Sequence, residues 1–173
     1  KKTGLRKSFA IGTKGGHPEI VSNPKPTNLS KVVLDEHLSR SLERLQTDYI
    51  DVYFVHRDEP SRSVAEILET MNEFITDGRV KAIGVSNFSL PRLIESREHA
   101  KKIGLTGFCA NQIGWSLATL KNQELIDRER VYMDDKLLKW HQSTGFPTLA
   151  YSSQAAGFFA GKYGCPIQDT TAG

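Results

Sequence analysis

The sequence has few cysteines and no long apolar run. Only two of its 173 residues are cysteine, Cys109 and Cys165, and they lie far apart, so we expect reduced thiols in a cytoplasmic protein. Cys109 lies inside an apolar run, which predicts simple packing. No stretch approaches the ~18 apolar residues of a membrane-spanning helix, and the first residues do not resemble a signal peptide. The sequence therefore predicts no association with a membrane.

A dominant charge is also missing. The chain has 23 Lys and Arg against 20 Asp and Glu, a net charge of +3, and the two signs are interleaved without a basic run. This pattern argues against nucleic acid as a partner. Hydrophobic residues make up 38% of the chain, which is ordinary for one domain with its own core, so we predict a single domain over residues 1–173.

Short apolar runs alternate with amphipathic helical patterns along the chain. The runs cover residues 8–14, 49–56, 80–87, 107–113 and 146–152. The helical patterns cover residues 30–45, 63–78, 89–104 and 133–145. The first pattern places Leu34, Leu38, Leu42 and Leu45 on one stripe. This alternation predicts a β/α protein whose parallel sheet is covered on both faces.

Polar side chains follow each predicted strand at its carboxyl end. They are Lys14, His56, Ser86 with Asn87, Asn111 with Gln112, and Tyr151 with Ser152. In a parallel sheet these ends lie at one edge, where (β/α)₈ barrels build their sites. A doubly wound sheet normally has a GxGxxG turn, but the only glycine cluster at a strand end here is TKGG, and the sequence has no P-loop. The sequence therefore predicts an α/β fold of the (β/α)₈ TIM barrel type.

Four segments, in order, resemble the aldo-keto reductase family. They are LSRSLERLQTDYIDVYFVH, DGRVKAIGVSNF, ANQIGWSL and AYSSQAAGFFAGKY, and the match runs from the TKGG strand to GKYG. Several motifs in register on a β/α repeat make the resemblance specific. It implies a barrel that binds NADPH in extended form at its carboxyl face, and hydride transfer to an aldehyde or a ketone. The choice of NADPH over NADH rests on the resemblance alone.

The same resemblance assigns two catalytic residues. Lys14 matches the family's active-site lysine, whose charge lowers the pKa of a neighbouring tyrosine so that it can give up a proton. His56 matches the active-site histidine, which donates a hydrogen bond to the substrate carbonyl and polarises it. The structural alternatives are a surface lysine just after a strand and a histidine held by a loop carbonyl.

A second group of residues matches the nicotinamide site. Ser86, Asn87 and Gln112 match positions that hydrogen-bond the carboxamide, and Tyr151 matches the ring that stacks on the nicotinamide. Asn111 is adjacent, but alternate strand residues point to opposite faces of a sheet. For Tyr151, a core tyrosine is the alternative interpretation.

The segment SSQAAGFFAGK, residues 152–162, resembles the family's pyrophosphate loop SPLxxGxLxGK. Small residues and glycine allow backbone N–H groups to approach phosphate closely. Ser153 and Gln154 depart from the family's proline and leucine. The positions that match are Ser152, Gly157, Gly161 and Lys162. Upstream, Trp115 fits a wall of the substrate pocket or plain packing equally well.

The chain is short for a complete barrel. A barrel of eight units needs ~250 residues, and the five predicted strands match the family's third to seventh, so we expect a domain truncated at both ends. The family's acid tyrosine and the aspartate that pairs with Lys14 belong to the first two strands. Tyr49, Asp51 and Tyr53 lie in a predicted strand and do not replace them. We expect this chain alone to be inactive and the remaining barrel segments to come from the rest of the protein.

Three functions remain open at this point. The first is a piece of an NADPH-dependent reductase of a small carbonyl substrate. The second is a nicotinamide-binding or interaction module without turnover. The third, a hydrolase using His56, requires paired carboxylates or metal-ligand spacing at the strand ends, and the sequence has neither. We therefore predict no metal site.

Overall fold

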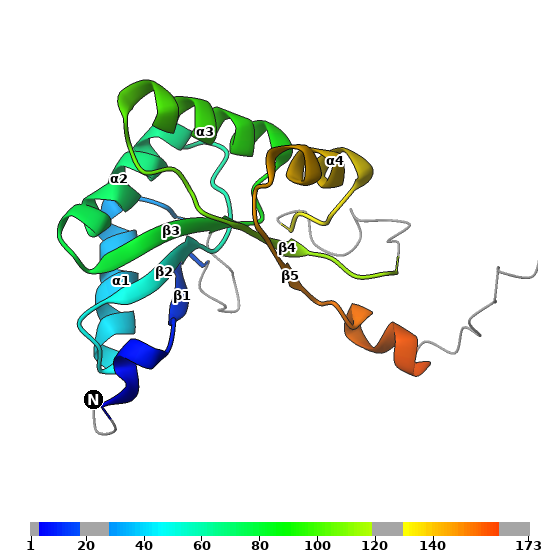
Figure 1. Cartoon of the computed structure of the whole chain (residues 1–173), viewed down its shortest axis with the longest axis horizontal. Coiled ribbons are helices and arrows are strands. Elements are labelled where there is room, and N and C mark those ends of the chain that lie inside the picture. The colour runs from blue at the N-terminus through cyan, green and yellow to red at the C-terminus, as the bar shows by residue number, and fades with distance from the viewer. Residues whose placement is uncertain (1–3, 18–27, 119–129, 163–173) are drawn as a thin grey trace, which may run out of the picture.

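Five parallel strands form one sheet whose order follows the chain (Figure 1). The computed structural model describes residues 4–17, 28–118 and 130–162, so Cys165 lies outside the described residues. The strands are β1 (Gly12–Gly15), β2 (Ile50–Val55), β3 (Val80–Ser86), β4 (Asn111–Gly114) and β5 (Thr148–Tyr151). Every neighbouring pair is parallel. This arrangement confirms the α/β prediction and is consistent with part of a (β/α)₈ barrel.

In the described part of the chain, four α-helices alternate with the strands, within two residues of the predicted bounds. They are α1 (Lys31–Leu45), α2 (Val64–Thr76), α3 (Leu90–Ile103) and α4 (Asp135–Thr144). The side chains of Ser30, Ser63 and Asp134 accept hydrogen bonds from the first N–H groups of α1, α2 and α4. Gly104 and Gly145 end α3 and α4 in the left-handed conformation that glycine adopts most easily.

The first strand is shorter than the sequence predicts. The run 8–14 gives a strand only from Gly12, because the chain before it forms the short 3₁₀ helix η1 (Leu5–Ser8). Arg6 anchors this helix through an ion pair of 2.8 Å with Asp51. Burial would raise the pKa of Asp51, but hydrogen bonds from a backbone N–H and from Arg6 lower it to about 2. Asp51 therefore has a structural role near the amino end of β2.

The fourth strand also begins later than predicted. The run 107–113 gives a strand only from Asn111, because the side-chain amide of Asn72 in α2 bonds both backbone groups of Thr106, each at 2.9 Å. This contact holds the chain beside α2 at Thr106, and backbone bonding to β3 begins at Cys109, whose N–H donates to the carbonyl of Ile83 at 2.7 Å. Cys109 in this approach is exposed, so its predicted packing is wrong: its two neighbours take the buried positions.

The apolar core lies between the sheet and the helices. Leu34 and Leu38 of α1 are fully buried and Leu42 packs partly buried against the core, so the predicted stripe fails only at Leu45, which is 45% exposed. Burying one large apolar side chain stabilises a fold by ~1.5–3 kcal/mol. The four α-helices lie along one side of the curved sheet (Figure 1), and the opposite side carries no α-helix of the described residues. Among the described residues, α-helices thus cover one face of the sheet.

Two neighbouring residues of β2 show how the faces of the sheet differ. Tyr53 points toward the helices, where its hydroxyl donates to the carbonyl of Leu34 at 2.9 Å and burial raises the pKa of the phenol well above its ordinary value. Phe54 points to the opposite, helix-free face. Its ring lies against Gly84, its partner in β3, so that a β-carbon at Gly84 would sit 2.4 Å from the ring. Glycine is required there by the ring of Phe54.

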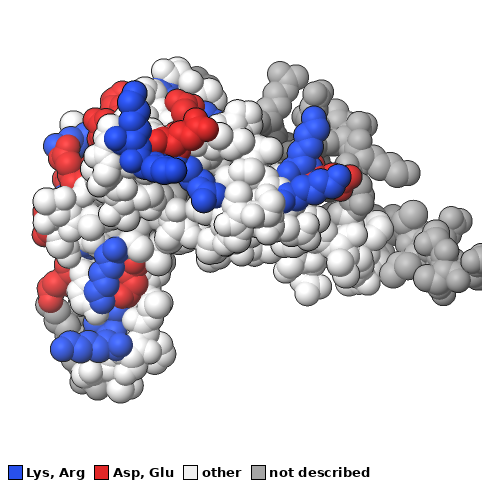
Figure 2. Space-filling model, turned by 45° about the horizontal axis from the view of Figure 1, so that its top comes forward, with Lys and Arg blue, Asp and Glu red and all other residues white. Residues whose placement is uncertain are grey.

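Charged side chains of both signs are interspersed over the face shown in Figure 2. Several of the charged side chains of the chain are paired: Arg79 forms ion pairs with Asp35 of α1 at 2.7 Å and with Asp77 at 2.6 Å. Among the described residues, no helix is long and apolar enough to cross a membrane. The mixed charge on this face agrees with the small net charge of the sequence.

Gly84→Ala is expected to destabilise the full-length protein by about 1–3 kcal/mol, because the added methyl group overlaps the ring of Phe54. Gly107→Ala is the matched control, since a β-carbon there meets only the Ala100 methyl at 3.6 Å and stabilisation by a few tenths of a kcal/mol is expected. Urea denaturation measures both changes. Adding Phe54→Leu to Gly84→Ala should recover part of the loss; equal stability of the two single variants would contradict this packing.

Candidate active site

The carboxyl ends of all five strands lie at one edge of the sheet. The register places Lys14 beside Phe54, Ser86 beside Gln112, and Gly114 beside Tyr151. Side chains alternate between the faces along a strand, so residues on one face can be identified from this register. Five predicted site residues share the helix-free face at this edge: Lys14, His56, Ser86, Gln112 and Tyr151.

His56 is the half-buried residue directly after β2. Its backbone is fixed on both sides: its N–H donates to the carbonyl of Gly15 at 2.8 Å, and its carbonyl accepts from the side chain of Asn87 at 3.1 Å. Burial lowers the pKa of His56 to about 4, and the neighbouring His17 and Lys14 act in the same direction. The imidazole is therefore neutral at pH 7, where one ring nitrogen can donate a hydrogen bond and the other can accept one.

Asn87 connects four parts of the site. Its Nδ2 donates to the carbonyl of His56 and to Ser86 Oγ, each at 3.1 Å. Its Oδ1 accepts the N–H of Val131 at 3.1 Å and the hydroxyl of Tyr151 at 2.6 Å. The residue adopts a φ of 60°, which asparagine tolerates better than most residues. Both ends of this amide are engaged within the protein, so a carboxamide ligand would have to replace one of these bonds.

Gln112 and Ser86 occupy paired positions on β4 and β3. Ser86 Oγ donates to the backbone carbonyl of Gln112 at 2.8 Å. The side-chain oxygen of Gln112 is buried and has no hydrogen-bond partner among the described residues. A buried amide oxygen without a partner is costly. Gln112 therefore offers an acceptor to a ligand at this edge.

Asn111 belongs to the opposite face. It pairs with Val85 and with Thr148, whose hydroxyl lies 2.8 Å from Nδ1 of His141 in α4, so this position faces the helices. Asn111 is fully buried, and neither atom of its amide has a hydrogen-bond partner among the described residues. The alternation of side chains thus separates Asn111 from Gln112, as the sequence indicated.

Tyr151 ends β5 and is held at its hydroxyl by Asn87. The ring of Tyr132 lies beside it, with the two centroids 6.4 Å apart. The backbone N–H of Trp115 donates to the carbonyl of Tyr151 at 3.1 Å, and the Trp115 side chain is 40% exposed. Tyr151 is half-buried at the edge of the sheet rather than enclosed in the core.

Unusual backbone conformations gather in the segment after β5. Outside glycine, five described residues have a positive φ, and three of them are Ser152, Ala155 and Ala156. Side chains make this conformation unfavourable, and such strain is concentrated at functional sites. Gly157 and Gly161 also have a positive φ, and the side chain of Lys162 packs over Gly157. This is the segment to which the sequence assigned the phosphate loop, and the N–H groups of Ala155, Gly157, Gly161 and Lys162 are bonded inside the segment itself.

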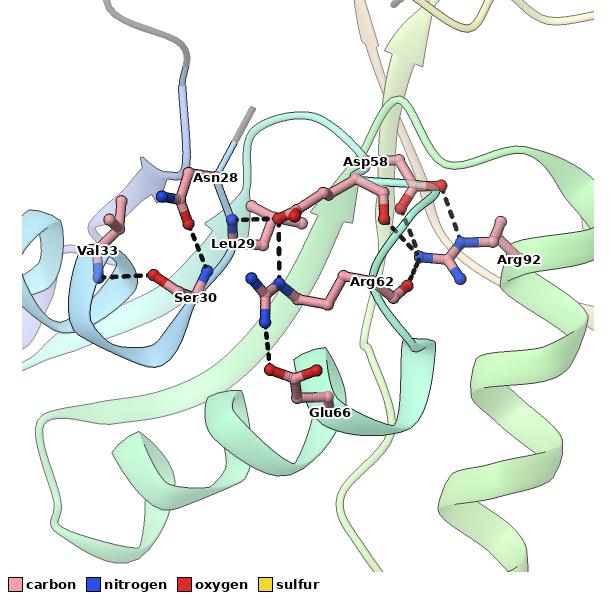
Figure 3. Close-up of polar contacts among 9 residues, drawn as sticks. Asn28, Leu29, Ser30, Val33, Asp58, Arg62, Glu66 and Arg92 are labelled. Carbon is pink, nitrogen blue, oxygen red and sulfur yellow. Dashed lines mark hydrogen bonds and ion pairs between the residues drawn. The ribbon is translucent and has the colours of Figure 1, made fainter. Parts of the chain in front are cut away.

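The loop after His56 is fixed by an ion pair that the sequence did not predict (Figure 3). Asp58 accepts from Nε of Arg92 at 2.9 Å and from Nη2 at 2.8 Å. Their side chains are only 12% and 15% exposed. Arg92 also donates to the carbonyl of Arg62 at 3.0 Å. The pair ties the His56 loop to the first turn of α3.

A second contact ties the same loop to the chain before α1 (Figure 3). Glu59 accepts from the N–H of Leu29 at 2.6 Å and from Nε of Arg62 at 3.1 Å. Arg62 also bonds Glu66 in α2. The sequence feature that could have indicated these ion pairs is the charged segment RDEP directly after a buried strand, since charges next to a buried strand need partners.

Two cavities are bordered by described residues, and the second lies beside the site, because Val131 bonds Asn87 and Tyr132 lies next to Tyr151. One, of about 450 Å³, borders α2 near Asn72 and Leu105. The other, of about 700 Å³, lies between the start of α3 and residues 131–137. Neither is lined by a residue to which the sequence assigned a site role. The described residues contain no group of three His, Cys, Asp or Glu side chains that could hold a metal ion.

Comparison with known proteins identifies relatives of the whole described region. A model of the aldo/keto reductase family matches residues 1–171. The chain is 34% identical over 136 residues to the aldo-keto reductase YhdN of Bacillus subtilis, covering 78% of this chain. It is 28% identical over 158 residues, 91% of this chain, to a candidate voltage-gated potassium channel subunit beta of Schizosaccharomyces pombe. Norsolorinic acid reductase of Aspergillus flavus is 33% identical over 115 residues, 66% of this chain.

These relatives are all much longer than the part that matches. The aligned region covers 35% of YhdN, 43% of the fission yeast protein and 29% of norsolorinic acid reductase. The chain thus spans less than half the length of each of these relatives.

Arg92→Met is expected to lower the free energy of unfolding of the full-length protein by about 3 kcal/mol, because it leaves the carboxylate of Asp58 nearly buried without its partner. The control is Arg40→Met, which breaks an exposed pair with Glu36 and should cost less than about 1 kcal/mol. Urea denaturation compares them. Adding Asp58→Asn should restore part of the stability of Arg92→Met, and equal losses for Arg92→Met and Arg40→Met would contradict a buried role.

Proposed function

The chain belongs to the aldo/keto reductase family, and on this basis we propose that the protein containing it is an NADPH-dependent oxidoreductase of the cytoplasm. It reduces an aldehyde or a ketone to the alcohol by hydride transfer. The substrate is a small molecule, and neither nucleic acid nor a membrane takes part. The activity belongs to the full-length protein, because the chain covers less than half of the relatives described above.

One observation carries this proposal: Lys14, His56 and Gln112 share one face at the carboxyl edge of the sheet, together with Ser86 and Tyr151. Two of the relatives carry the name of a reductase, which favours redox chemistry at that edge. The lack of a three-residue metal cluster among the described side chains gives no support to a metal-dependent hydrolase.

His56 and Lys14 are the proposed catalytic residues of this chain. The neutral imidazole of His56 donates a hydrogen bond to the carbonyl oxygen of the substrate and stabilises the negative charge that develops there. Lys14 lowers the pKa of a tyrosine that gives its proton to the same oxygen. The two tyrosines nearest to β2 do not fit the role of this acid. Tyr53 is buried toward the helices, and Tyr49 precedes the amino end of the strand. The acid is expected from another part of the protein.

The side chains that would hold the cofactor provide the hydrogen-bonding groups and the aromatic ring that a nicotinamide requires. NADPH, when bound, supplies the hydride. The unpaired amide oxygen of Gln112 accepts from the carboxamide, with Ser86 and Asn87 beside it, and the ring of Tyr151 provides the stacking surface. The segment after β5 would hold the pyrophosphate at the four positions that match the family, Ser152, Gly157, Gly161 and Lys162, where the N–H groups of the last three would have to exchange their present backbone partners for phosphate oxygens.

A non-catalytic module is the second candidate. It is favoured by the 28% identity to a protein named as a potassium channel subunit, over 91% of this chain. In that case the same residues bind the nicotinamide without turnover, and the full-length protein binds NADPH but leaves an added aldehyde unreduced. Measuring cofactor binding by fluorescence and turnover by loss of reduced-nicotinamide absorbance in the same sample distinguishes the two.

His56→Ala in the full-length protein is expected to lower kcat/KM for carbonyl reduction by 10²–10³-fold, about 2.7–4 kcal/mol of transition-state stabilisation, with the Kd for NADPH nearly unchanged. His99→Ala is the matched control, because His99 lies on α3 and contacts Glu69, away from the strand ends. Steady-state kinetics and cofactor fluorescence are the measurements. A variant that loses cofactor binding while keeping its rate would assign His56 to a different role.

The 173-residue chain alone is expected to show no NADPH-dependent reduction, because neither Tyr49 nor Tyr53 fits the acid that Lys14 would tune, and the family resemblance assigns that tyrosine to the first two strands of the barrel. The unpaired edges of β1 and β5 should also promote association. Incubation with NADPH and a reactive aldehyde, followed by absorbance, tests the first point, and light scattering tests the second. The full-length protein is the control. Turnover by the short chain at ~1–10³ per second would show that the acid lies within it.

A further inference from the structure

His17 brings a second imidazole to the candidate active site. It is half-buried, lies three residues after Lys14 and follows the end of β1. Its ring contacts the ring of His56 edge to face, with the centroids 4.4 Å apart and the planes at 63°. The resemblance to the family assigned no role to this position, and no step of the proposed chemistry uses it.

The backbone fixes this contact from both sides. Gly16 turns the chain with a φ of 76°, and a β-carbon there would lie 2.3 Å from Leu29, so glycine is required before His17. The N–H of Gly16 donates to Nδ1 of His37 in α1 at 3.0 Å. On the other strand, the N–H of His56 donates to Gly15 at 2.8 Å. These bonds hold the ends of β1 and β2 together, and the backbone therefore places the rings of His17 and His56 against each other.

We propose that His17 is a positioning residue for His56, holding its ring in place and keeping it in the neutral form that donates to the carbonyl oxygen. This inference rests on the proposed role of His56. An edge-to-face contact restricts rotation of the His56 ring about its outer torsion, and misplacing a catalytic group by ~1 Å lowers a rate steeply.

The charges around His56 act in the same direction. The groups that face it are His17 and Lys14 near the end of β1, Arg57 directly after it, and Arg130 in the segment between β4 and α4, and all of them disfavour a proton on His56. Burial contributes most to its pKa of about 4, and His17 is the first of the charged neighbours. A histidine partner differs from Lys14 in that it also packs against the ring.

His17→Phe separates the two effects, because it keeps an aromatic ring and removes the nitrogens that can take up a proton. In the full-length protein, the pKa of His56 should rise, measured by NMR titration of the ring C–H signals. Since the neutral ring is the active form, the acid limb of the pH profile of kcat/KM should move to higher pH together with the pKa of His56. His99→Phe, a change on α3, should leave both curves unchanged.

His17→Ala removes the packing as well, and should lower kcat about tenfold at pH 7 with the KM for NADPH unchanged. His17→Gln is a second, polar substitution, used in case His17→Phe or His17→Ala fails to fold. It should change the pKa of His56 in the same direction as His17→Phe. The inference is overturned if His56 titrates identically in the parent protein, His17→Phe and His17→Gln. The NMR titration needs no turnover, so a protein that reduces no carbonyl yet shows the shift would refute the proposed function and leave the histidine pair standing.

Discussion

Parallel pairing of consecutive strands is the constraint on which the site depends. Each strand of a parallel sheet must be followed by a crossover, and here helices make those crossovers along one side of the sheet. The carboxyl ends of all five strands then lie at one edge of the sheet, and no further sequence feature is needed to bring them together. Lys14 and Tyr151 are far apart in the chain, yet this pairing alone brings them to one edge and one face.

Much of the fold follows from local patterns in the sequence. The helices begin at Ser30, Ser63 and Asp134 because these side chains satisfy N–H groups that a helix leaves unpaired, and such residues can be recognised in the sequence alone. The strands were harder to delimit. An apolar run predicts burial but not pairing, so the contacts that shorten β1 and β4, made by Arg6 and by Asn72, left no periodic signal.

The candidate site was predictable in its position and less so in its connections. Alternation along β4 correctly separates Gln112 from Asn111, because side-chain direction has a period of two. The bonds of Asn87 to four partners, and the pair of Asp58 with Arg92, join residues distant in the chain. Such contacts depend on how loops close, and a single sequence carries no information about their geometry. The roles of the site residues remain predictions from family resemblance.

The packing of Phe54 against glycine links the evolution of three strands. Its ring lies against Gly84 in β3, and a β-carbon at Gly12 in β1 would also touch it, at 3.7 Å. One aromatic side chain therefore fills the volume that three separate side chains would otherwise share. Substitution at any of these positions changes the space available at the others, so they cannot diverge independently. In related sequences, a smaller residue at the position of Phe54 should accompany a larger one at the position of Gly84, a covariation set by volume alone.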